Sequence, residues 1–150
     1  MIRLTNLADY AVVLMCEMTH TDGRVSAQDL AAATSIPAPT VAKILNALGR
    51  AALLQSHRGL KGGFALSKSA DDITVADIIE AIDGPISLTH CADTGTSDCC
   101  YDEICQMRPR WQVINSAVKN ALADVKLSSI AAFGTPEEMV ERFEKRAKSA

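Results

Sequence analysis

The order of apolar and polar residues near the start of the chain predicts one long helix. Residues 4–20 carry an apolar stripe at helical spacing, made of Leu7, Tyr10, Ala11, Leu14 and Met18. The opposite side is also mostly apolar, with Val12, Val13 and Cys16 beside Asp9. A helix that is apolar nearly all round is buried on two sides. We therefore expect contacts with its own domain and with a partner subunit, and we interpret Cys16 as a small buried hydrophobic residue.

Two shorter helices follow. Ser26, with Asp29 three residues later, predicts a capped helix that ends near Thr34. Pro39 fits the first turn of the next helix, whose apolar face consists of Val41, Ile44, Leu45 and Leu48. The tight connection between the two helices predicts a helix-turn-helix.

The period then changes to that of extended strands. Residues 53–58 and 63–67 flank "RGLKGG", whose glycines permit the positive φ of a hairpin tip. A helix-turn-helix followed directly by a hairpin with a basic tip is the winged-helix pattern.

The second half is helical again, around one polar interruption. Thr74 and Asp77 cap a helix that Gly84 and Pro85 end. A segment without periodicity follows, then a long helix from about 108 to 125, and a last helix that Thr135 caps. The predicted fold class is mainly α with a small β-hairpin. We expect residues 1–70 to form the winged helix and residues 71–150 the polar loop and its helices, within one integrated domain.

Length and hydropathy restrict the setting of the protein. A chain of 150 residues favours one domain. No apolar run reaches the roughly 18 residues that span a bilayer, and the first residues do not resemble a secretory signal. We therefore expect a cytoplasmic protein without a membrane partner.

Charge divides the chain and favours a DNA partner for its first part. Residues 1–70 hold seven Lys or Arg against four acids, whereas residues 71–107 hold nine acids and neither Lys nor Arg. The first part therefore suits a polyanion and the middle would repel one. In the second helix of the helix-turn-helix, Ala38, Pro39, Thr40 and Lys43 are placed to enter a major groove. Arg58 and Lys61 on the wing would meet phosphates or a minor groove.

Four of the five cysteines lie between Cys91 and Cys105, spaced C-x7-C-C-x4-C. Iron–sulfur clusters require several thiolates converging on one inorganic core. Zinc is the main alternative; the C-x(2–4)-C pairs usual for it are missing, but His90 beside Cys91 allows a Cys3His site. A thiol–disulfide switch is a third possibility. A polar loop offers no core in which four thiols would simply pack.

The chain resembles the Rrf-type bacterial transcription regulators, which include the Isc iron–sulfur regulator, the nitric-oxide sensor NsrR and regulators of SUF cluster-assembly operons. The resemblance lies in "LTNLADYAV", the helix-turn-helix, "SHRGLKGGFALSK", "ITVADIIEAIDGP", the cysteine loop and the helix from "RPRW". It implies a homodimer in which the long helix crosses its twin. It also implies an iron–sulfur cluster, 2Fe–2S slightly favoured over 4Fe–4S, held by Cys91, Cys99 and Cys105.

Two departures from the family pattern concern the fourth ligand. The first cysteine gap is longer than usual, and Arg108 stands where Isc regulators have a histidine. This combination looks most like the SUF-type regulators. The resemblance to nitric-oxide sensors suggests Asp9 of the other subunit as the fourth ligand, with Cys100 or His90 as substitutes. Equally, Asp9 in a first helical turn could simply stabilise the helix dipole.

We therefore expect a repressor of iron–sulfur assembly genes that binds a double-stranded DNA operator and senses cluster or redox status. A nitric-oxide or redox sensor of the same family, or a zinc- or thiol-dependent DNA-binding protein, is the alternative. An iron–sulfur electron carrier or enzyme is a further class. It is disfavoured because the sequence shows no phosphate-binding loop, Ser/His/Asp arrangement or other sign of a small-molecule substrate.

Overall fold

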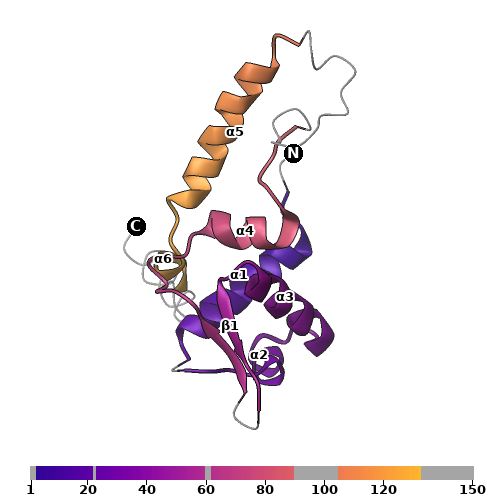
Figure 1. Cartoon of the computed structure of the whole chain (residues 1–150), viewed down its shortest axis with the longest axis vertical. Helices are drawn as coiled ribbons and strands as arrows, with labels where there is room; N and C mark the ends of the chain where they lie inside the picture. Colours follow the sequence, from indigo (N-terminus) through magenta and orange to yellow (C-terminus); the bar gives the residue numbers. More distant parts are fainter. Residues whose placement is uncertain (1–2, 22, 60–61, 90–104, 133–150) are drawn as a thin grey trace, which may run out of the picture.

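The computed structural model describes residues 3–21, 23–59, 62–89 and 105–132. In chain order its elements are α1 (Asn6–Thr19), α2 (Ala27–Thr34), α3 (Ala38–Arg50), β1 (Leu54–His57), β2 (Gly63–Leu66), α4 (Val75–Asp83), α5 (Arg108–Ala123) and α6 (Leu127–Ala131). The fold is mainly helical with one antiparallel hairpin, which confirms the predicted fold class. Figure 1 shows α1 to α4 and the hairpin gathered in one body, from which α5 projects.

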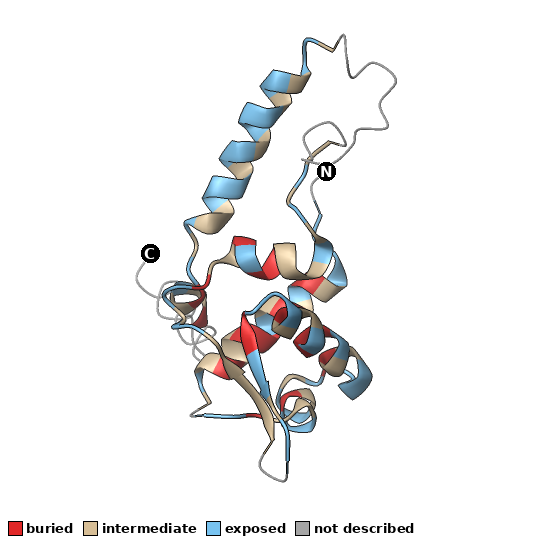
Figure 2. Ribbon diagram, in the orientation of Figure 1, coloured by how far each residue is buried: buried red, intermediate tan, exposed pale blue. Residues whose placement is uncertain are grey.

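The core of this body forms around α1. Leu14 and Met15 of α1 and Leu45 of α3 are fully buried, and Figure 2 shows the buried residues concentrated in these helices. Ile78 of α4 and Leu127 of α6 belong to the same apolar cluster. The core therefore draws on both sides of residue 70.

Local sequence signals set the ends of α2 and α4. Ser26 Oγ accepts a hydrogen bond from the Asp29 backbone N–H at 3.1 Å, and the Asp29 carboxylate accepts one from the Ser26 N–H at 3.3 Å. Thr74 and Asp77 form the same reciprocal capping box on α4. Both predicted caps are confirmed; each satisfies amides that a helix start leaves unpaired.

The wing is joined to the helix-turn-helix by backbone hydrogen bonds. β1 and β2 pair from Leu54 opposite Leu66 to His57 opposite Gly63. Val25, just before α2, exchanges two hydrogen bonds with Phe64, at 3.0 and 2.8 Å. Gly63 has φ of 151°, and a Cβ there would lie 2.8 Å from the Val25 carbonyl oxygen. This close approach requires glycine.

α5 contributes no buried residue to the body. It begins at Arg108 as predicted and ends at Ala123, slightly earlier than expected. Val113 is 71% exposed and Ile114 44% exposed, and Figure 2 shows the helix mostly exposed along its length. Exposed apolar side chains on one helix are typical of a surface that another protein surface covers.

Short α6 was not predicted from the sequence. It follows α5 after a short turn. Around this turn the backbone pairs with the residues at the start of α4. The Val75 N–H donates to the Val125 carbonyl at 2.9 Å, and the Leu127 N–H donates to the Ile73 carbonyl at 2.8 Å. This pairing holds the C-terminal end of α5 against the body. The helix predicted after Thr135 lies outside the described residues.

Candidate nucleic-acid interface and metal centre

The exposed side of α3 lies opposite its apolar face. Val41, Ile44, Leu45 and Leu48 are buried, so Pro39 and Lys43 must face outward. Ala38 is exposed, and Thr40 is half-buried while its N–H donates to the Pro37 carbonyl at 2.9 Å. The structure thus places all four predicted α3 residues on or beside one accessible helix start.

Two further polar residues share this exposed stripe and were missed by the sequence reasoning. Asn46 and Arg50 are exposed and follow Lys43 by three and seven residues, which keeps them on the same helix face. The signal was present, because they occupy the positions opposite the apolar set. Asn46 adds an amide that can pair with base edges, and Arg50 adds a cation.

The wing carries its exposed cation next to β1. Arg58 is exposed directly after β1. Lys61, its predicted companion, lies outside the described residues. Gln55 and Ser56 on β1 are also exposed, so the strand offers hydrogen-bonding groups beside Arg58.

Four cysteines lie between Cys91 and Cys105, which we call the cysteine segment. Of the cluster ligands predicted there, the structure describes Cys105. It is a half-buried free thiol three residues before α5 begins. Cys91, Cys99, Cys100 and His90 lie outside the described residues. Across the described part of the chain, no three His, Cys, Asp or Glu side chains gather into a metal-binding group. The ligand set stays a prediction.

Asp9 lies in the first turn of α1 and is exposed. Its backbone N–H donates to the Thr5 carbonyl at 3.1 Å, and Thr5 caps the helix by accepting from the Ala8 N–H at 3.1 Å. In Figure 1, α1 lies within the body and α5 projects from it like an arm, with the start of α5 at the end away from the body. Among the described residues, Asp9 is not part of any group of three His, Cys, Asp or Glu side chains.

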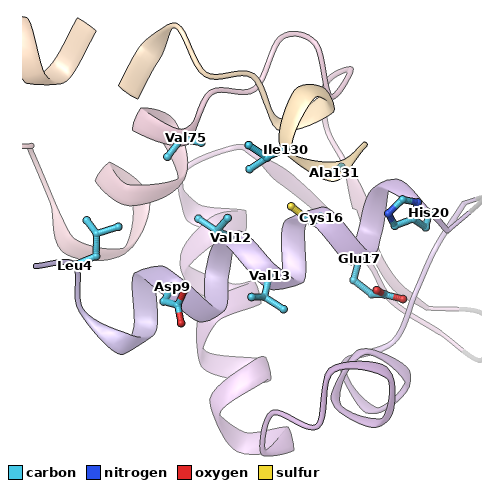
Figure 3. Close-up of a pocket in the computed structure, with 10 residues that line it drawn as sticks. All are labelled: Leu4, Asp9, Val12, Val13, Cys16, Glu17, His20, Val75, Ile130 and Ala131. Atoms are coloured by element: carbon cyan, nitrogen blue, oxygen red, sulfur yellow. The ribbon is translucent and has the colours of Figure 1, made fainter. Parts of the chain in front are cut away.

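A groove of about 550 Å³ runs along α1, between it and the start of α4 and α6. Figure 3 shows Val12 and Cys16 facing Val75 and Ile130, with Asp9 on the outer side of α1. Cys16 is half-buried, less than the sequence suggested, and it packs against the core. Burial raises the pKa of the Cys16 thiol, so it stays protonated at neutral pH, as expected of a packing residue.

The base of the cysteine segment is held by polar side chains that the sequence reasoning did not identify. Asn115 of α5 accepts a hydrogen bond from the Leu88 N–H through Oδ1 and donates one to the Ile86 carbonyl through Nδ2, both at 2.9 Å. Glu80 of α4 accepts from the Ile86 N–H at 3.2 Å and forms an ion pair with Lys119 at 2.7 Å. α4, α5 and residues 86–88 therefore meet at one point.

α3 is the second helix of the helix-turn-helix, and its exposed polar side makes it the recognition helix. A winged helix with such a recognition helix is typical of one class of proteins, the DNA-binding transcriptional regulators. The sequence profile of the Rrf2 family, described as iron-dependent transcriptional regulators, matches residues 4–132. The chain belongs to this family. The expectation of a regulator and not an enzyme is thereby confirmed, as is the resemblance to the Rrf-type proteins.

Several relatives agree with this family assignment. A helix-turn-helix-type transcriptional regulator of Mycobacterium tuberculosis is 31% identical over 142 residues, which cover 93% of this chain and 87% of that protein. The regulator IscR of Photobacterium profundum is 29% identical over 93% of this chain and 81% of its own length. The solved structure of CymR, the global cysteine regulator of Bacillus subtilis, superposes with a TM-score of 0.68 at 27% identity, covering 90% of this chain and all of that one.

None of the helices that the structure describes is long and apolar enough to cross a membrane.

Proposed function

We propose that the protein is a cytoplasmic, homodimeric repressor whose affinity for a DNA operator depends on an iron–sulfur cluster. The observation that carries the proposal is the arrangement of α5. This helix leaves the body with an exposed apolar face, and a free thiol stands at its outer end. Two copies of such an arm can cover each other and place that thiol beside the other subunit.

In the proposed dimer, α5 crosses its twin through the stripe that includes Trp111, Ile114 and Val118. These residues are half-buried or exposed in the single chain, so covering them removes apolar surface from water. A twofold dimer would present two α3 helices to DNA half-sites about one helical turn apart. Residues 1–70 would read the DNA and residues 71–150 would carry the sensor, within one integrated domain.

The proposed cluster is held by Cys91, Cys99 and Cys105, with 2Fe–2S favoured over 4Fe–4S. Thiolates suit iron–sulfur clusters, and the family description names iron dependence. Asp9 of the other subunit would complete the ligand set, with Cys100 and His90 as substitutes. The exposure of Asp9 supports this role, because its carboxylate is accessible to the other subunit.

On the DNA side, we assign base contacts to the start of α3 and phosphate contacts to the cations around it. Thr40 and Asn46 carry groups that can pair with base edges, while Lys43, Arg50 and Arg58 would neutralise phosphates. Ala38 and Pro39 would allow close approach of the backbone, and Lys61 would extend the wing contact. The proposed targets are iron–sulfur assembly genes.

A second candidate is regulation by thiol chemistry or nitric oxide without a role in cluster supply. It is favoured by the likeness to CymR, the global cysteine regulator of Bacillus subtilis. The free state of Cys105 is compatible with this function too. A zinc-bound form belongs to the same alternative.

Cysteine variants of the full chain, purified without oxygen, test the proposed site. Cys91→Ala, Cys99→Ala and Cys105→Ala should each abolish visible cluster absorbance, whereas Cys100→Ala should keep most of it. Bleaching by Cys100→Ala with absorbance retained in Cys99→Ala would reverse that assignment. A colourless wild-type protein containing zinc or no metal would favour the second candidate.

A further inference from the structure

Polar side chains near the middle of α5 contact the part of the chain that follows α4 and α4 itself. α5 has no buried residue, and Figure 1 shows most of its length standing clear of the body. Near its middle, the Asn115 and Lys119 side chains bind residues that follow or belong to α4. These contacts, together with the backbone pairing at the C-terminal end of α5, hold α5 against the body.

Asn115 uses both ends of its amide on one short stretch of backbone. Its oxygen accepts from Leu88 and its nitrogen donates to Ile86, each at 2.9 Å, as an adjacent strand would. Other polar side chains would match this pair of bonds less well, because an amide supplies one acceptor and a donor group in a fixed plane. The two bonds thus match the acceptor and the donor of one amide group.

Glu80 ties the same stretch to α4. One carboxylate oxygen accepts from the Ile86 N–H at 3.2 Å and from the Lys119 ammonium at 2.7 Å. Glu80 directly follows Ile78 and Ile79 on α4, and Ile78 shares the core cluster with Leu48 of α3. The helix that carries Glu80 therefore also packs against α3.

The contact sits where the cysteine segment is anchored. Leu88 precedes Cys91 by three residues, and Cys105 precedes α5 by three. One end of the segment is thus joined covalently to α5, and the other is joined to the same helix through Asn115. The Asn115 contact and the start of α5 are therefore the two described points at which this segment joins the helix.

We propose that Asn115, with Glu80, is a positioning residue that sets the angle of α5 and transmits the state of the cysteine segment to α3. This inference rests on the proposed function, because it assumes that the cluster state alters DNA affinity. A residue that merely stabilises the fold would weaken DNA binding equally with and without the cluster. A transmitting residue changes the ratio of the two affinities.

The test measures that ratio in the full-length protein. The probe is a duplex that the wild-type protein selects from a random-sequence pool, and its Kd is measured for cluster-loaded and cluster-free protein. Asn115→Ala is compared with Asn120→Ala, an exposed asparagine on the same helix. Amide hydrogen exchange of Leu88 reports independently whether the contact has been broken.

For Asn115→Ala we expect Leu88 exchange to speed up at least about tenfold while the ratio of Kd values falls to within about threefold of one. Asn120→Ala should keep the wild-type ratio. A wild-type ratio in Asn115→Ala, with Leu88 exchange accelerated, overturns the inference and leaves the proposed function intact. A ratio of one in the wild-type protein overturns both.

Lys119→Met provides a second variant in case Asn115→Ala does not fold. The Lys119 side chain is about half exposed, so we expect the fold to tolerate the loss of its charge. We expect a partial fall in the ratio of Kd values, smaller than that of Asn115→Ala. An unchanged ratio in Lys119→Met, when Asn115→Ala cannot be measured, counts against the inference.

Discussion

The Thr5 hydroxyl donates a hydrogen bond to Asp83 at 2.7 Å and so joins the first residue before α1 to the last residue of α4. Thr5 also caps α1 by accepting from the Ala8 N–H. One side chain thus fixes the start of the helix that carries Asp9 and ties it to the helix that carries Glu80. Residues from the two sides of position 70 are linked at this point.

Removing the Thr5 hydroxyl should destabilise the fold modestly. Thr5→Ala loses the cap and the link to Asp83, which together should cost about 1–2 kcal/mol in the free energy of unfolding. Thr5→Ser keeps both bonds and should lose much less. Urea unfolding followed by circular dichroism measures the difference, and equal stability of the two variants would contradict the role given to the hydroxyl.

Two glycine substitutions should act in opposite directions. Gly63→Ala places a Cβ 2.8 Å from the Val25 carbonyl at φ of 151°, so it should destabilise the protein by about 1–3 kcal/mol. Gly49→Ala lies within α3 with its nearest neighbour at 3.9 Å, and it should stabilise by up to about 1 kcal/mol. Thermal unfolding measures both. A neutral Gly63→Ala would show that the wing does not pack on Val25 as described.

Cations on the exposed side of α3 should determine the salt dependence of DNA binding. Lys43→Ala and Arg50→Ala should each lower the slope of log affinity against log salt by about 0.9, the value for one phosphate contact on duplex DNA. Lys68→Ala is the matched control, because Lys68 is exposed but follows β2 at the base of the wing. The interface assigned here would be wrong if Lys68→Ala changed the slope and the α3 variants did not.

Asp9→Ala should shorten the lifetime of the cluster without unfolding the dimer. If Asp9 is a ligand, its loss should speed the decay of visible absorbance by about tenfold or more, as expected for a weakened metal site. Glu17→Ala changes another acid that lines the same groove along α1 and should leave the lifetime unchanged. Equal lifetimes in wild type and Asp9→Ala would remove Asp9 from the ligand set.

The sequence correctly predicted the helix caps and the buried helix face, which depend on residues close together in the chain. The caps formed by Ser26 with Asp29 and by Thr74 with Asp77 span three residues each, so local preference suffices to identify them. The apolar period of α3 likewise revealed which face is buried, and its complement contains Asn46 and Arg50.

What escaped prediction depends on contacts between distant parts of the chain. Asn115 meets Ile86 across 29 positions and Thr5 meets Asp83 across 78, and neither pair leaves a periodic signal. α6 has five residues and no side-chain cap, and its buried residues are Leu127 and Ala131. Two apolar positions without a cap are too few to predict a helix from the sequence. The choice between Cys99 and Cys100 as ligand rests on spacing alone, since both lie outside the described residues.

The most direct test of the central claim is the affinity for DNA before and after removal of the cluster. Protein purified anaerobically with its cluster, and the same preparation after chelation of its iron, should bind the selected duplex with affinities that differ by about 5–150-fold. Both forms should remain dimers by sedimentation. Equal affinities of the two forms, or an anaerobic preparation without iron and sulfide, would contradict the account.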